Sequence, residues 1–251
     1  MGARFHINEM YVKDKLTISL LSNLNNPLSG HIIRSILAYG VPIDSILLDA
    51  KPVSDEYLEK VWAQRTNKQW EFVSFHEFAR EKIPFFFVEN HSSESAINLV
   101  KERGINLLVN AGTPRILRSG IIQAPSYGVL NCHPSILPDY RGCSAVEWAI
   151  LNDDKVGNTI HFMTEEIDEG PIAAQETISF LRSDNYHDIR IKVYQHGVDM
   201  MAKQIRYFVE MGVDFSLFET PSNGKYYKPI DDESLSKVIT KLEKGKYIHQ
   251  L

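Results

Sequence analysis

The stretch Thr17-Ile18-Ser19-Leu20-Leu21 decides the fold class together with the residues that follow it. A short apolar run of this kind predicts a buried strand. After a polar loop, the apolar residues recur at helical spacing, at Leu28, Ile32, Ile33, Ile36 and Leu37. The chain therefore opens with a strand, a loop and a helix.

The same alternation continues along the chain. Short apolar runs predict further strands at 43–48, 84–88, 105–109, 128–133, 159–163 and 172–180. Helical patterns cover 53–65, 94–103, 186–211 and 231–244, and Gly104 suits a left-handed cap after the second of these. Strands that alternate with helices predict an α/β fold with a mostly parallel central sheet flanked by helices. Ligands of such sheets bind beyond the carboxyl ends of the strands.

The polarity of the segments suggests three parts. We expect a polar N-terminal arm over 1–15, a main domain over 16–215, and a short helical C-terminal extension over 216–251 that packs on the core. A length of 251 residues, with 43% hydrophobic and 24% charged residues, is enough for one sizeable core.

Charge and composition argue against several classes of protein. The net charge of −5 provides no broad basic field for nucleic acid. No apolar run approaches the roughly 18 residues of a membrane span, and the N-terminus does not have the order of a signal peptide. The two cysteines, Cys132 and Cys143, match no disulfide framework or zinc pattern. We therefore expect a cytoplasmic protein without a structural zinc site and with no nucleic-acid or membrane partner.

Polar side chains at the end of one predicted strand are candidates for catalysis. Asn131 and His133 are two residues apart, so both leave the same face of the strand, while Cys132 points the other way. Asp168 follows in a glycine-containing turn, after His161 on the adjoining strand. An amide and a cationic imidazole could stabilise an oxyanion, and a carboxylate could orient the imidazole or accept a proton.

Spacing alone leaves other interpretations open, because a chain with nine histidines offers many such triples. The pair Asn131 and His133 could be an ordinary hydrogen-bonded turn. His133, His161 and Asp168 could bind a metal in a hydrolase, and a binding module without catalysis is a third interpretation. His161 is better explained as support for the strand than as an acid, and Arg141 suits an anionic substrate group or a solvated loop equally well.

Three longer motifs occur in one order, at 131–142 (NCHPSILPDYRG), 157–163 (GNTIHFM) and 166–172 (EIDEGPI). Together they resemble the 10-formyltetrahydrofolate-dependent formyltransferases. That family includes glycinamide ribonucleotide formyltransferase, methionyl-tRNA formyltransferase and the amino-sugar N-formyltransferases. The resemblance implies a Rossmann-like formyltransferase fold, with Asn131, His133 and Asp168 as catalytic residues.

The resemblance also implies a co-substrate and a reaction. The co-substrate is 10-formyltetrahydrofolate, without a metal, and the amine attacks the formyl group directly through a tetrahedral intermediate. The segment 111–117 is similar to the family's folate-pocket segment, and the loop before Asp168 is similar to the segment on the other side of that pocket. The implied folate-binding residues are Arg115, Ile116, Leu117, Thr164, Glu165, Glu166 and Ile167.

The acceptor is less well defined by the motifs. The purine-synthesis member binds a phosphate with a glycine-rich loop after the first strand, whereas 22–30 contains only Gly30, although its asparagines and serines could still bind a phosphate or a sugar. The tRNA-acting members carry a separate C-terminal β-domain, and the formyltetrahydrofolate hydrolases an N-terminal regulatory domain. About seventy residues follow Phe180 here, largely with a helical pattern.

By elimination we expect a small amine, best a nucleotide-linked amino sugar. An atypical glycinamide ribonucleotide enzyme is the alternative. The identity of the amine and the formation of a homodimer stay open.

Overall fold

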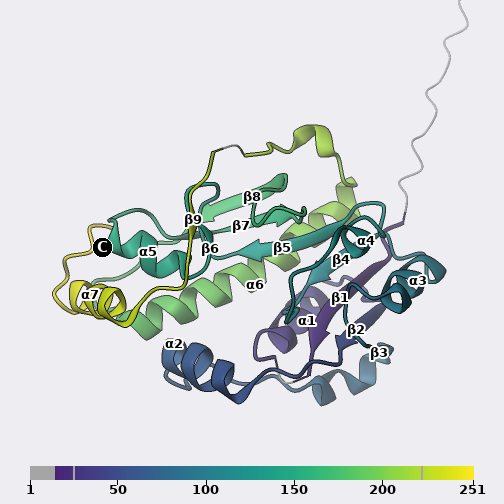
Figure 1. Ribbon diagram of the computed structural model, residues 1–251, viewed down its shortest axis with the longest axis horizontal. Coiled ribbons are helices and arrows are strands. Elements are labelled where there is room, and N and C mark those ends of the chain that lie inside the picture. Colours follow the sequence, from purple (N-terminus) through teal and green to yellow (C-terminus); the bar gives the residue numbers. More distant parts are fainter. Residues whose placement is uncertain (1–14, 25, 222) are drawn as a thin grey trace, which may run out of the picture.

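A computed structural model describes residues 15–24, 26–221 and 223–251. The polar arm predicted for 1–15 lies outside the described residues, apart from Lys15. A seven-stranded sheet has the order β3-β2-β1-β4-β5-β7-β8 (Figure 1). Its strands are β1 (Ile18–Asn23), β2 (Ser45–Asp49), β3 (Phe85–Val88), β4 (Leu107–Asn110), β5 (Val129–His133), β7 (Gly157–Phe162) and β8 (Ile172–Thr177).

The sheet is parallel from β3 to β5 and antiparallel from β5 to β8. This confirms the predicted α/β fold with a mostly parallel sheet. The strand predicted for 172–180 ends at Thr177. Each of the other strands lies within three residues of its predicted position.

Helices cover both faces of the sheet (Figure 1). On one face α1 (Ser29–Ala38) and α6 (Tyr186–Met211) pack against the strands, and on the other face lie α3 (Glu94–Glu102) and α4 (Ser119–Ile122). The bounds of α6 match the predicted helix, because Asn185 forms a capping box with Asp188 at its start and Gly212 follows its last residue.

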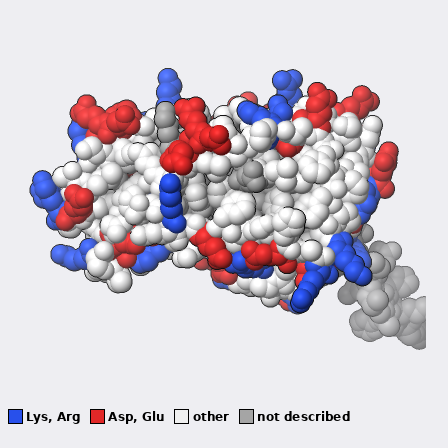
Figure 2. All heavy atoms as spheres, turned by 90° about the horizontal axis from the view of Figure 1, so that it is seen from below, with Lys and Arg blue, Asp and Glu red and all other residues white. Residues whose placement is uncertain are grey.

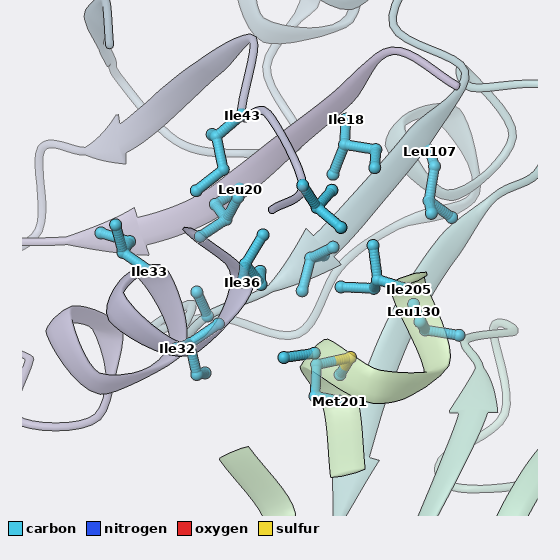
Figure 3. Packing of buried hydrophobic residues seen from close by; sticks show 14 of the residues in the cluster. Ile18, Leu20, Ile32, Ile33, Ile36, Ile43, Leu107, Leu130, Met201 and Ile205 are labelled. Carbon is cyan, nitrogen blue, oxygen red and sulfur yellow. The ribbon is translucent and has the colours of Figure 1, made fainter. Parts of the chain in front are cut away.

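The larger apolar cluster lies between the sheet and the helices α1 and α6. Ile18 and Leu20 of β1 point toward Ile36 of α1, and Met201 of α6 closes the same layer (Figure 3). Leu21, the next residue of β1, belongs to the cluster on the α3 side. This alternation is the reason that the apolar run of β1 has no polar face: the strand is buried on both sides.

Several shorter elements were not predicted from the sequence. These are the 3₁₀-helix η2 (Phe75–Glu81), the strands β6 (Arg141–Gly142) and β9 (Tyr226–Tyr227), the helix α5 (Ala145–Leu151) and the 3₁₀-helix η3 (Phe215–Leu217). The helix predicted for 53–65 is a π-helix, η1 (Tyr57–Ala63), continued by α2 (Gln64–Thr66). The C-terminal helix α7 (Asp232–Glu243) packs on α5 through Val238 and Leu242.

The described surface carries mixed charge. On the face shown in Figure 2, acidic and basic side chains are interspersed around a largely uncharged middle. No helix in the described part of the chain is long and apolar enough to cross a membrane.

A buried group of charges joins α2, α5 and α6. Glu147 accepts a hydrogen bond from the Tyr186 hydroxyl at 2.7 Å, and its carboxylate lies 3.5 Å from the Arg190 guanidinium and 3.6 Å from that of Arg65. Burial disfavours the charged form of Glu147, but the two guanidinium groups hold its pKa below the usual value. The negative charge of Glu147 thus balances the positive charges of both Arg190 and Arg65.

Replacing Glu147 with Gln should destabilise the fold by about 3–5 kcal/mol, because it leaves buried Arg190 without a counter-charge. Urea unfolding measures the loss. The matched control is Glu233→Gln, which removes an exposed partner of Lys237 and should leave the unfolding midpoint unchanged. Equal midpoints for the two variants would contradict this account of the buried charges.

Candidate active site

The pairing of β5 with β7 brings the polar motif residues to one face of the sheet. In this antiparallel pair Asn131 lies opposite His161, and His133 lies opposite Thr159. Cys132 points to the other face, as predicted, where it packs against α6. A β-carbon added at Gly197 of α6 would lie only 2.9 Å from the Cys132 sulfur.

Asp168 lies in the turn after β7 and faces both histidines. Its Oδ2 atom is 3.5 Å from Nδ1 of His133, and its Oδ1 atom is 3.6 Å from Nε2 of His161. The backbone N–H of Gly142 donates to Oδ2 at 2.8 Å. Asp168 has a φ of 56°, a left-handed conformation that costs a non-glycine residue roughly 1–3 kcal/mol. The structure thus brings together the three residues predicted from the motifs.

The loop after β5 fixes the ring of His133. Its Nε2 atom donates to the Tyr140 carbonyl at 2.6 Å, which leaves Nδ1 facing Asp168. Thr159 holds this loop: its hydroxyl donates to the Ser135 carbonyl at 2.7 Å and accepts from the Leu137 N–H at 3.1 Å. These two hydrogen bonds hold the loop that brings the Tyr140 carbonyl to the imidazole.

His161 supports Asn131. The Asn131 amide nitrogen lies 3.0 Å from His161 Nε2, and an amide nitrogen can only donate, so Nε2 carries no proton. The proton on Nδ1 then faces the Phe162 carbonyl at 3.2 Å. Burial lowers the pKa of His161, against the opposing attraction of Asp168, which agrees with a neutral ring. Among the described residues, no group of three or more His, Cys, Asp or Glu side chains is arranged to hold a metal ion.

A cavity of about 240 Å³, called cavity A, opens beside these residues. Asn131, His161 and Asp168 line it. The seven residues predicted for the folate pocket line it as well: Arg115, Ile116, Leu117, Thr164, Glu165, Glu166 and Ile167. The sequence motifs had placed these segments 47 or more residues apart, and the fold brings them to opposite walls of one cavity.

The walls of cavity A suit a flat heteroaromatic ring. Ile116 and Ile167 are exposed apolar side chains, one from each wall. The backbone groups of Ile116 and Leu117 make no hydrogen bond to any other described residue. Apolar faces with free backbone donors and acceptors fit a pterin, which carries hydrogen-bonding groups around its edge.

The charge of Arg115 is compensated within the protein. Its Nε donates to both carboxylate oxygens of Asp49, at 3.1 and 2.9 Å, and the His91 backbone N–H donates to the same carboxylate at 3.2 Å. Although burial opposes it, the contact with Arg115 lowers the pKa of Asp49. Asp49, at the end of β2, thereby holds the side chain of Arg115, which lines one wall of cavity A.

A second cavity of about 280 Å³, called cavity B, lies next to cavity A, and Thr113 lines both. Cavity B is bounded by the loops after β1, β2 and β4 and by Tyr57. The side-chain amide oxygen of Asn23, Oδ1, lies at its wall, is buried and has no hydrogen-bond partner among the described residues. Lys51 adds a cationic amine. The loop at 22–30 and the segment 111–117 were noted in the sequence, whereas Lys51 and Tyr57 were not predicted as site residues.

Arg141 has a structural position that neither sequence interpretation anticipated. Its guanidinium donates to the Gly224 carbonyl at 2.7 Å and contacts Glu169. The backbone of β6, which contains Arg141, pairs with β9. Gly142 allows this pairing, because a β-carbon there would lie 2.5 Å from the Tyr227 carbonyl oxygen. The C-terminal segment thus supports the N–H group that binds Asp168.

The structure thus combines a mostly parallel sheet with an amide, an imidazole and a carboxylate beside a cavity at β5. A family model described as formyl transferase matches residues 59–205. The chain therefore belongs to the formyl transferase family.

Two relatives show the range of similarity. Methionyl-tRNA formyltransferase from Thermotoga sp. (strain RQ2) is 28% identical over 153 residues, which are 60% of this chain and 48% of that protein. Bifunctional polymyxin resistance protein ArnA from Wigglesworthia glossinidia brevipalpis is 34% identical over 127 residues, 50% of this chain and 19% of that protein. The chain thus spans at most about half the length of these relatives.

Solved structures share the fold. Glycinamide ribonucleotide transformylase 1 from Symbiobacterium toebii superposes with a TM-score of 0.59 at 24% identity, over 81% of this chain and 92% of that one. A sugar N-formyltransferase from Shewanella sp FDAARGOS_354 gives a TM-score of 0.55 at 22% identity, over 85% and 77%.

The two thiols should differ sharply in reactivity. Burial raises the pKa of Cys132 to about 12, whereas Cys143 is exposed. Iodoacetamide at neutral pH should label Cys143 in the native protein much faster than Cys132, and unfolding in urea should remove most of this difference. Peptide mass spectrometry distinguishes the two sites, and rapid native labelling of Cys132 would contradict its position against α6.

Proposed function

We propose that the chain transfers a formyl group from 10-formyltetrahydrofolate to the amine of a small acceptor, by direct attack through a tetrahedral intermediate. One observation carries the proposal. Asn131 and Asp168 line the same cavity as both predicted folate segments, with His133 in reach of Asp168. The co-substrate supplies the formyl carbon at this point.

Each catalytic residue has a role that its contacts support. Because Nε2 of His133 is held by the Tyr140 carbonyl, the Asn131 amide and the Nδ1–H of His133 are the groups that can donate toward the formyl oxygen, where negative charge develops. Asp168, 3.5 Å from His133 Nδ1, stabilises the cationic ring and accepts the proton that the attacking amine releases. The Gly142 N–H keeps this carboxylate directed at the ring.

Cavity B supports a nucleotide-linked amino sugar as the acceptor. The Lys51 amine suits a phosphate, the Tyr57 ring suits a sugar or base, and the unpartnered side-chain oxygen of Asn23 suits a hydroxyl donor. A phosphoribosyl acceptor would meet the same Lys51, so an atypical glycinamide ribonucleotide enzyme is the alternative.

Asn131→Ala and His133→Ala should each lower kcat by at least about 10²-fold, because both side chains act on the transition state. Binding of 5-formyltetrahydrofolate, measured by calorimetry, should persist in both.

Asp168→Asn should also fold and should lose most of its turnover, whereas Cys132→Ser should keep most of its turnover. Normal turnover in either alanine variant, or a formyl thioester on Cys132 in quenched enzyme, would refute the proposed roles.

A panel of acceptors should separate the candidate substrates. With 10-formyltetrahydrofolate in excess, nucleotide-linked amino sugars should give the fastest release of tetrahydrofolate. Glycinamide ribonucleotide should react slowly because the loop at 22–30 has few glycines, and charged tRNA should react slowly because the chain carries a net charge of −5. A kcat/KM of about 10⁴ M⁻¹s⁻¹ or more for either would overturn this choice of acceptor.

A further inference from the structure

We propose that Asn110 is a positioning residue that fixes which way the catalytic amide of Asn131 points. The inference rests on the proposed function, since it assigns a role at the same site. Asn110 is the last residue of β4, which pairs with β5, and its side chain lines cavity A.

The amide orientation of Asn110 is set by the backbone. Its Oδ1 atom accepts from the N–H groups of Gly112 at 3.1 Å and Thr113 at 2.9 Å. A backbone N–H can only donate, so this end of the side chain must be the oxygen. The Nδ2 group of Asn110 is therefore directed toward β5, where it donates to Oδ1 of Asn131 at 2.9 Å.

The same reasoning then orients Asn131. With its oxygen held by Asn110, its nitrogen faces His161 and uses one hydrogen there, at 3.0 Å. A primary amide has a second N–H, which is left for the formyl oxygen. If the amide turned over, its carbonyl oxygen would take that place and repel the developing oxyanion. Asn110 thus selects the productive orientation of Asn131.

The hydrogen bonds of Asn110 also link Asn131 to the backbone segment that separates cavity A from cavity B. Gly112 and Thr113, which hold the Asn110 oxygen, both line cavity B, and Thr113 lines cavity A too. The position of this wall therefore determines the orientation of the catalytic amide through a single side chain.

Two variants test the proposal. Asn110→Asp keeps an acceptor for Gly112 and Thr113 but places an oxygen against the Asn131 oxygen, and Asn110→Ala removes the contact altogether. Each should lower kcat about 10–100-fold, while the dissociation constant of 5-formyltetrahydrofolate changes by less than about threefold. If the aspartate variant does not fold, the alanine variant carries the test.

The matched control is Asn106→Asp. Asn106 precedes the same strand at its far end, where its side chain also binds backbone groups, those of Thr17 and Lys15. Its substitution should leave kcat within about twofold of the wild type, because the side chain of Asn106 makes its hydrogen bonds to Thr17 and Lys15 and none to Asn131.

A double-mutant cycle separates positioning from a merely structural effect. If Asn110 acts through Asn131, then Asn110→Asp should change kcat by less than about threefold in an Asn131→Ala background. An undiminished further loss in that background, or normal kcat in both Asn110 variants of an active enzyme, overturns this inference alone. A wild-type chain that transfers no formyl group to any acceptor overturns the proposed function and this inference together.

Discussion

The antiparallel pairing of β7 with β5 is the constraint on which the rest of the site depends. The four strands before β5 run parallel to it, and the change of direction sets Asn131 opposite His161 and His133 opposite Thr159. A shift of the register by one residue would turn both catalytic side chains toward α6 and bring Cys132 into the site. The same pairing determines where β7 ends, and so where the turn with Asp168 begins.

Polar side chains buried on this face would destabilise the fold if they had no partners. The chain meets this requirement with directed hydrogen bonds: Asn131 lies between Asn110 and His161, and His133 between Tyr140 and Asp168. Such contacts leave few orientations open to the reacting groups. Preorganised donors of this kind account for much of the rate acceleration in acyl transfer, so the interactions that stabilise the folded site are also those that its proposed chemistry needs.

Much of the architecture could be predicted from the sequence, since α6 and the strands of the parallel sheet have long periodic patterns or uninterrupted apolar runs. The residues Asn131, His133 and Asp168 could be predicted as site residues because each lies within a specific sequence motif. Asn110 and Asp49 were not singled out, since each acts on a residue at least 21 positions away and leaves no local pattern. Both end a strand of a parallel sheet, the position where site residues are expected. The support of Gly142 by β9 also could not be predicted from a local pattern, because the paired residues are 85 positions apart in the sequence.

A crystal structure of the chain with bound 5-formyltetrahydrofolate, a stable analogue of the proposed co-substrate, would locate the reacting carbon directly. We expect the pterin in cavity A, between Ile116 and Ile167, with backbone groups of Leu117 at its edge and the one-carbon substituent directed toward Asn131. A pterin bound elsewhere, or one whose one-carbon substituent points away from Asn131, His133 and Asp168, would show that these three residues do not surround the reacting carbon.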